Sequence, residues 1–357
     1  MKSKTWLTVS STAKHWSHHQ QSLLYQHSLP SVTSVRHLPT VVDPPTPSKP
    51  SPSIITTKKE TARHLAYTTT PRYYPIYTHP KRWFEPHTRP SFVFAHGASG
   101  FAKRQRYTTP DTHKYNSQHY YSIQIGEDAY FRRSDALGVA DGVGGWSGVS
   151  AANAALYSRK LMHHAYLELE RLNTMEDADP VCILQKSYEE SMQEAQKEGI
   201  IGSCTACLAI LRHQELRIAN IGDCGISVIR QNNYIFRTEE QQHAFNFPYQ
   251  LGTSSPDRPN DAQSFTVAVE KGDIIIMGSD GLFDNLFDKE ILSIVRSLKR
   301  SEPQKISDAL AERAKTVSHS KLNIDSPFGK RAVNEGLYYK GGKLDDISVL
   351  VAIVKDG

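Results

Sequence analysis

The segment Ala136-Leu-Gly-Val-Ala-Asp-Gly-Val-Gly-Gly-Trp146 contains the pattern on which the fold assignment rests. Small and apolar residues of the kind found in a buried strand run up to Asp141, and a glycine follows directly. Glycine lets the backbone bend tightly and lets a carbonyl oxygen come close to a ligand. We therefore predict a strand that ends in a cation cradle made of the Asp141 carboxylate and the Gly142 carbonyl.

The same pattern recurs at Asp280-Gly281, and a further acid stands at the other end of a strand. The apolar strand in Asp273-Ile-Ile-Ile-Met-Gly-Ser-Asp-Gly-Leu-Phe283 is followed by Asp280, and Asp345 stands just before the last apolar strand. An Asp-Gly pair taken alone is more often an ordinary turn. Acids at several strand ends are a stronger signal, because burying a carboxylate is costly unless it is paired or binds a metal.

A fourth acidic segment is Gly126-Glu-Asp-Ala-Tyr-Phe131, which we interpret as part of one continuous strand that begins at Tyr121. Side chains alternate between the two faces of a strand. Alternation puts Glu127 on the same face as Ile123, so its carboxylate is predicted to point into an apolar layer. Asp128 is predicted to point the other way.

The candidate ligands are all oxygen atoms, which favours Mg²⁺ or Mn²⁺ over zinc or copper. Two such ions bridged by one carboxylate would activate a shared water for in-line attack on phosphorus. The acids therefore indicate metal-assisted chemistry on a phosphate.

Short apolar segments bounded by turn residues predict a strand-rich core from about residue 92 onward. The expected strands are Tyr121–Phe131, Ala136–Ala140, Thr205–Leu211, Leu216–Asn220, Gly225–Arg230, Ser264–Val269, Asp273–Met277 and Ile347–Val354. Helical spacing of apolar residues predicts helices around Ala155–Leu169, Val181–Ala195, Lys289–Leu298 and Pro303–Val317. Because strands and helices come in blocks, we expect an α+β domain of layered, mainly antiparallel sheets.

The N-terminal part differs in composition from the rest. Residues 1–42 contain no acid and are rich in Ser, Thr and His, and their basic residues are Lys2, Lys4, Lys14 and Arg36. This composition is typical of an organellar transit peptide, and we predict import into the mitochondrial matrix; chloroplast leaders and ordinary tails share it. Residues 43–94, rich in proline and serine at their start, predict a disordered linker, and residues 95–357 the folded domain.

The charge distribution argues against nucleic acid as a partner. The first hundred residues hold twelve Lys and Arg against three Asp and Glu, so their net charge is +9 and that of the remainder is −4, within a total of +5. A basic domain suited to nucleic acid is therefore not indicated. No run approaches the roughly 18 apolar residues that cross a bilayer. We expect no transmembrane segment and a monomeric domain.

The four cysteines, Cys182, Cys204, Cys207 and Cys224, are too few for a disulfide scaffold in a chain of 357 residues. Cys204 and Cys207 lie in a predicted buried strand, where residues three apart face opposite sides, so zinc is not expected. Cys224 and Arg230 have the Cys-x5-Arg spacing of phosphatases with a thiolate nucleophile. The residues between them alternate as in a strand, which disfavours a phosphate-binding loop.

Six motifs, in order along the chain, resemble one known family. They are Gly-Glu-Asp at 126–128, Ala-Asp-Gly-Val-Gly-Gly at 140–145, Gly-Ser at 202–203, Asn-x-Gly-Asp at 220–223, Ser-Asp-Gly-Leu-Phe-Asp at 279–284 and Asp-Asp-Ile-Ser-Val at 345–349. The sequence resembles the metal-dependent protein phosphatases (PPM, or PP2C-type), and segments such as 242–251 resemble the mitochondrial branch related to yeast phosphatase seven. The resemblance spans about residues 95–356. It implies a four-layer αββα sandwich of two mainly antiparallel sheets flanked by helices.

The resemblance also implies roles for the acids. Two Mn²⁺ or Mg²⁺ ions would be bridged by Asp141, with Glu127 and the Gly142 carbonyl on one ion and Asp280 and Asp345 on the other. Asp128 would act through water, and Asp223 would help to bind a third, weaker ion. A hydroxide between the ions would attack phosphoserine or phosphothreonine directly, with Asp141 and Asp280 as the catalytic acids. The implied substrates are phosphorylated mitochondrial proteins.

Two positions depart from the family's pattern. Many relatives have His where this chain has Val143, and Arg where it has Ile123, so the leaving-group acid and the phosphate-binding residue stay unassigned. Candidate phosphate contacts are Lys103, Arg104, Arg106, Lys114, Arg132 and Arg133. The alternative function is a phosphatase fold that has lost its chemistry and serves as an adaptor.

Overall fold

The computed structural model describes residues 92–103, 120–146, 149, 151–172, 178–298, 300–320 and 324–357. The predicted leader, 1–42, and nearly all of the predicted linker lie outside these residues. The first described strand, β1, begins at Phe92, three residues before the predicted start of the domain.

One sheet has six strands in the order β13-β7-β6-β4-β3-β2, and each pairing is antiparallel. Its strands are β2 (Ile123–Ile125), β3 (Asp128–Arg132), β4 (Ala136–Ala140), β6 (Ala206–Arg212), β7 (Glu215–Ile221) and β13 (Gln263–Ala268). Every residue of β4 and β6 is buried, because both faces of these central strands are covered. Their sequences are therefore continuous apolar runs rather than alternating ones.

The second sheet has five antiparallel strands in the order β1-β15-β14-β8-β9. They are β1 (Phe92–Phe101), β8 (Gly225–Arg230), β9 (Asn233–Arg237), β14 (Ile274–Gly278) and β15 (Ile347–Asp356). The strand β1 was not predicted, because its Ala, His, Gly and Ser residues give little hydrophobic periodicity. It pairs with β15 along its whole length, from Phe92 opposite Asp356 to Phe101 opposite Ile347.

The helices are α3 (Ala154–Leu172), α4 (Pro180–Glu198), α5 (Asp280–Phe283), α6 (Asp288–Ser297), α7 (Pro303–Ser318) and α8 (Pro327–Asn334). The four predicted helices correspond to α3, α4, α6 and α7. Four short strands, β5 (Ser203–Cys204), β10 (Gln242–Ala244), β11 (Phe247–Pro248) and β12 (Leu251–Gly252), make two small two-stranded pairings. No helix in the described parts of the chain is both long and apolar enough to span a membrane.

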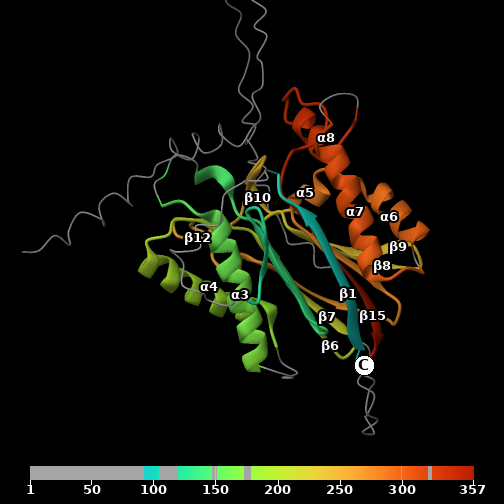
Figure 1. Ribbon diagram of the computed structural model, residues 1–357, viewed down its shortest axis with the longest axis horizontal. Coiled ribbons are helices and arrows are strands. Elements are labelled where there is room, and N and C mark those ends of the chain that lie inside the picture. The colour runs from blue at the N-terminus through green and yellow to red at the C-terminus, as the bar shows by residue number, and fades with distance from the viewer. Residues whose placement is uncertain are drawn as a thin grey trace, which may run out of the picture. The chain divides into compact units, whose positions relative to one another are not determined.

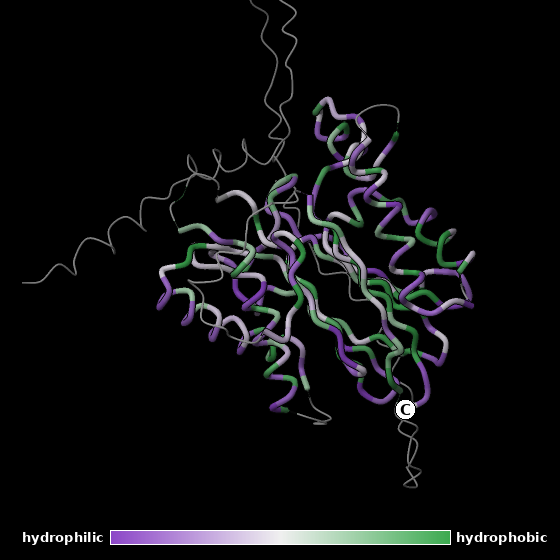
Figure 2. The backbone as a smooth tube through the Cα atoms, viewed as in Figure 1, coloured by the Kyte–Doolittle hydropathy of each residue, from purple (hydrophilic) through white to green (hydrophobic). Residues whose placement is uncertain are grey.

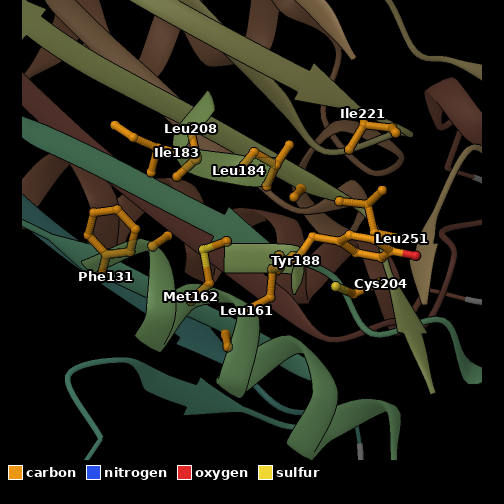
Figure 3. Close-up of a cluster of buried hydrophobic side chains, with 14 of the residues drawn as sticks. Phe131, Leu161, Met162, Ile183, Leu184, Tyr188, Cys204, Leu208, Ile221 and Leu251 are labelled. Atoms are coloured by element: carbon orange, nitrogen blue, oxygen red, sulfur yellow. The ribbon is translucent and has the colours of Figure 1, made fainter. Parts of the chain in front are cut away.

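The helices cover the outer faces of the two sheets, so the domain has four layers (Figure 1). In Figure 3, Leu161 and Met162 of α3, Ile183 of α4 and Leu208 of the six-stranded sheet belong to one cluster of buried side chains. Leu137 and Leu350 belong to the core between the two sheets. Figure 2 shows hydrophobic residues along the strands and hydrophilic residues on the flanking helices. The predicted αββα sandwich is confirmed.

The predicted strand from Tyr121 to Phe131 is wrong in one respect, because it is interrupted by a turn. The strand β2 ends at Ile125 and β3 begins at Asp128, so Gly126 and Glu127 form the turn of a hairpin. Gly126 has a φ of +63°, which favours glycine. Alternation is therefore reset at the turn: Glu127 is not on a strand face, and Asp128 is the fully buried acid.

Candidate active site

The predicted acids come together because four chain segments end at the same edge of the two sheets. In the six-stranded sheet, Ala129 of β3 pairs with Ala140 of β4, which places Asp128 and Asp141 at adjoining strand ends. In the other sheet, a Cβ atom added to Gly281 would collide with the carbonyl oxygen of Asp346. The segment that carries Asp280 therefore lies directly against the start of β15.

Asp128 connects the two sheets. Its Oδ2 atom accepts a hydrogen bond of 2.7 Å from the Ser279 hydroxyl, while its buried Oδ1 atom has no hydrogen-bond partner among the described residues. Burial, reinforced by the nearby Asp346 carboxylate, raises the pKa of Asp128 well above its ordinary value. The Oδ1 atom of Asp128 is therefore a position where a cation or a further hydrogen-bond donor could bind.

Asp141 and Asp280 lie close enough for the charge of each to act on the other. Burial raises the pKa of Asp280 to about 6, and burial together with the charge of Asp280 raises the pKa of Asp141 well above its ordinary value. The Oδ1 atom of Asp280 is buried and has no partner in the described part of the chain.

Lys343 lies on one side of these acids, and its position in the site was not predicted. Its Nζ atom contacts Asp280, lies 2.7 Å from Asp284 Oδ2, and is 3.4 Å from Asp345 Oδ2. Burial alone would lower the pKa of Lys343, but the three carboxylates outweigh it and raise the pKa. The Asn285 side chain holds the Lys343 backbone through two hydrogen bonds of 2.9 Å.

Lys103 lies on the other side of Asp345. Its Nζ atom is 2.9 Å from Glu127 Oε2, 3.0 Å from Asp345 Oδ1 and 3.7 Å from Asp346 Oδ2. Burial would raise the pKa of Asp345, but the ammonium groups of Lys343 and Lys103 hold it below its ordinary value. Asp345 is thus flanked by one cation on each carboxylate oxygen.

Asp346 is a second residue that the sequence interpretation missed. Its buried carboxylate accepts hydrogen bonds from the backbone N–H groups of Lys103, at 2.7 Å, and Glu127, at 2.8 Å. A Cβ atom at Gly126 would overlap this carboxylate. The sequence shows an Asp-Asp pair at 345–346 and a glycine at 126. Nothing in the sequence shows that Asp346 and Gly126 are in contact.

Gly142, predicted to belong to a cation cradle after β4, packs tightly against the β2–β3 turn. The Gly142 N–H donates to the Glu127 carbonyl at 3.1 Å, and a Cβ atom at Gly142 would collide with that carbonyl oxygen. The Thr205 N–H donates to the Asp141 carbonyl at 2.9 Å, and the Val143 N–H donates to the Ser203 carbonyl at 2.9 Å. The backbone around Asp141 is therefore held on both sides.

Two further acids lie at the edge of this cluster. Burial, with the charge of Asp280, raises the pKa of Asp223, the residue predicted to serve a third ion. Burial, with the charge of Asp284, raises the pKa of Glu240 to about 7. Arg331 pairs with Asp284 and with Glu240 at 3.3 Å, which balances part of this charge.

The donor set fits hard divalent cations. Within the described ranges, no three His, Cys, Asp or Glu side chains stand close enough together to hold a metal ion as they are, and Lys103 and Lys343 lie between the acids instead. The unpartnered oxygens of Asp128 and Asp280 nevertheless mark positions where a cation would satisfy buried carboxylates.

The cysteine alternatives fail on geometry. Cys204 is buried in the core under α3 and α4, Cys207 in the core between the sheets, so they face opposite sides as predicted. Cys224 is buried beside the Thr205 hydroxyl at 3.1 Å, and burial raises the pKa of its thiol. Arg230, at the other end of β8, pairs with Asp273 at 2.8 Å. These two residues do not make a phosphate loop.

Of the cations proposed for phosphate contacts, the structure brings Lys103 to the acids. Arg133 pairs with Asp135 at 2.8 Å and with Glu170, away from the site, and Arg132 is exposed at the end of β3. Arg104, Arg106 and Lys114 lie outside the described residues. Ile123, where many relatives have Arg, is 46% exposed.

Comparison with known proteins agrees with this geometry. Residues 133–354 match the family described as Stage II sporulation protein E (SpoIIE). The chain is 39% identical over 248 residues to the protein phosphatase PTC7 homolog of Danio rerio, covering 65% of this chain and 82% of the relative. It is 39% identical over 234 residues to probable protein phosphatase 2C 80 of Arabidopsis thaliana, covering 64% of this chain. The match spans about half of that relative, 54% of its length.

The X-ray structure of the photosystem II phosphatase PBCP is similar to this domain. The TM-score is 0.62 at 33% sequence identity, and the match covers 73% of this chain and 99% of that one. The fold, the order of the motifs and the 39% identity over 82% of the Danio rerio relative all indicate the same family. The chain belongs to the PP2C-type (PPM) family of metal-dependent protein serine/threonine phosphatases.

Proposed function

We propose that this protein hydrolyses phosphoserine and phosphothreonine in protein substrates with the help of two Mn²⁺ or Mg²⁺ ions. The observation that supports it most is the meeting of acids from four separate segments, two of them with unpartnered buried oxygens. Membership of the family supports the same reaction.

The proposed ion ligands follow the sites described above. Asp141 would bridge both ions, Glu127 and the Gly142 carbonyl would bind one, and Asp280 and Asp345 the other. Asp128 would act through water, and Asp223 would serve a third ion. When bound, the ions supply a hydroxide nucleophile and neutralise charge on the phosphate.

The chain's own residues hold this arrangement in place. The Ser279 hydroxyl orients Asp128, and the Asp346 carboxylate holds the backbone of Glu127. Positioning of this kind matters because ligands that are already oriented need no reorganisation during the reaction.

The test is hydrolysis of a phosphothreonine peptide by the full-length protein, with EDTA or with added Mn²⁺ or Mg²⁺. We expect metal-dependent turnover that falls at least about 100-fold in Asp141→Ala and Asp280→Ala, because each loses a proposed ion ligand. Asp356→Ala, at the far end of β15 and paired with Lys271, is the matched control and should leave turnover unchanged. Cys224→Ser should be nearly silent.

The adaptor alternative rests on Val143 and Ile123. Metal binding measured by calorimetry without any turnover would favour the adaptor. Turnover that persists in Asp280→Ala would overturn the assignment of the site itself.

We further propose that the protein acts on mitochondrial proteins. The acid-free, basic composition of residues 1–42 supports import, and a fusion of residues 1–94 to a fluorescent protein should reach mitochondria.

A further inference from the structure

Two lysines lie among the proposed ion ligands, and a cationic side chain there could bind a phosphate together with the metal ions. Among the described residues, Lys103 and Lys343 contact the proposed ion ligands. They differ in access to solvent: the side chain of Lys343 is 11% exposed and that of Lys103 is 29% exposed. Lys343 is enclosed by Asp280, Asp284 and Asp345. Its charge therefore neutralises these three carboxylates and is not accessible to a ligand from solvent.

The backbone of Lys103 is fixed next to the site. It follows β1, whose last residue, Phe101, pairs with Ile347 at the start of β15. The Lys103 N–H then donates to the buried Asp346 carboxylate at 2.7 Å. Replacing the Lys103 side chain leaves both of these backbone contacts in place.

The ammonium group of Lys103 has capacity for another anion. It carries three N–H donors, and two anions, Glu127 at 2.9 Å and Asp345 at 3.0 Å, lie within hydrogen-bond distance. Asp346, at 3.7 Å, lies beyond it. If Glu127 and Asp345 bind the metal ions, the positive charge of the ions neutralises these carboxylates. The positive charge of Lys103 is then available to bind another anion.

In the part of the chain that the structure describes, Arg331 is a third cation near the acid cluster. It pairs with Asp284 and Glu240, neither of which is a proposed ion ligand, so it stands farther from the reacting phosphate. Lys103, by contrast, lies directly beside two proposed ligands and faces solvent.

We propose that Lys103 binds the phosphoryl group of the substrate, and the inorganic phosphate product, beside Glu127 and Asp345. The inference rests on the proposed function. A charge-assisted hydrogen bond from a lysine to a phosphate oxygen would position the phosphoryl group without bidentate geometry.

The experiment measures inorganic phosphate binding to the full-length protein in saturating Mn²⁺, by calorimetry and by inhibition of phosphothreonine-peptide hydrolysis. We compare Lys103→Gln and Lys103→Arg with the control Lys271→Gln, whose exposed side chain pairs with Asp356. We expect phosphate affinity to fall about tenfold in Lys103→Gln, as for one lost charged hydrogen bond, and KM to rise in parallel. Lys103→Arg should recover most of the loss, and Lys271→Gln should match the original protein.

A separate titration with Mn²⁺ alone distinguishes phosphate binding from a merely structural role. Lys103→Gln should bind Mn²⁺ at least as tightly as the original protein, because a competing cation has been removed. Phosphate affinity within twofold of the original in Lys103→Gln would overturn the inference while leaving the phosphatase proposal intact. Parallel loss of Mn²⁺ affinity would also overturn it. If no protein in the set turns over peptide, the phosphatase proposal fails, and the phosphate calorimetry still decides the role of Lys103.

Discussion

At the scale of single residues, the site holds two built-in cations among its acids. Lys343 and Lys103 each contact two proposed ion ligands, and Asp345 contacts both lysines. A divalent ion that enters this cluster must share carboxylates with an ammonium group that is already present. The lysines therefore stabilise the metal-free protein and weaken its hold on the metal.

Substitution of Lys343 tests this balance. In EDTA, Lys343→Met should lose about 3 kcal/mol of unfolding free energy, because it leaves Asp280, Asp284 and Asp345 without their buried counter-ion. Mn²⁺ should restore most of that stability and should bind more tightly than to the original protein. Thermal unfolding and calorimetric Mn²⁺ titration measure both effects, with Lys271→Met as the surface control. Weaker Mn²⁺ binding in Lys343→Met would contradict the prediction.

At the scale of secondary-structure elements, the β2–β3 turn brings Glu127 to the site. The turn requires a positive φ at Gly126 and close contact between Gly126 and the Asp346 carboxylate. The positive φ disfavours a residue with a Cβ atom, and the Asp346 carboxylate fills the space that the Cβ atom would need. The conformation of the turn therefore depends both on Gly126 and on Asp346, which directly precedes β15.

Substitution of Gly126 tests whether the β2–β3 turn positions Glu127. Gly126→Ala should destabilise the protein by at least about 1–2 kcal/mol and weaken Mn²⁺ binding, since Glu127 would be displaced along with the turn. The control is Gly272→Ala, which has a similar backbone requirement, with a φ of +92°, but no atom where its Cβ would lie. Equal effects of the two substitutions on Mn²⁺ affinity would show that the Gly126 turn does not position a ligand.

At the scale of the whole chain, charge separates the N-terminal part from the catalytic domain. The first hundred residues carry +9 and the remainder −4. The proposed leader, which is basic and free of acids, would be attracted to the negatively charged interior of mitochondria, whereas the net negative charge of the remainder does not favour nucleic acid.

Localisation of a fusion protein tests this division. In plant protoplasts, which contain both organelles, residues 1–94 fused to a fluorescent protein should accumulate in mitochondria. Replacing Lys2, Lys4, Lys14 and Arg36 by glutamine should leave the fusion diffuse, because the positive charge that drives import is removed. Signal in chloroplasts, or import of the glutamine variant, would contradict the mitochondrial proposal.

Local sequence patterns determined much of this protein. The apolar runs of β4, β6 and β14 are recognisable because each central strand is buried on both faces. Helical periodicity marked α3, α4, α6 and α7, and the acids and glycines at strand ends marked the candidate ligands, whose role as ligands remains a prediction. These features depend on residues near each other in the chain, so one sequence suffices to find them.

Tertiary structure decided what depends on distant residues. The turn at Gly126 became evident because Asp346, 220 positions along the chain, fills the space of a missing side chain. Nothing local distinguished Lys103 from the other candidate phosphate contacts or marked Lys343, because a lysine in a loop usually lies on a surface. The strands β1 and β15 bring both lysines to Asp345. Chain topology, which local periodicity does not encode, put the cations among the acids.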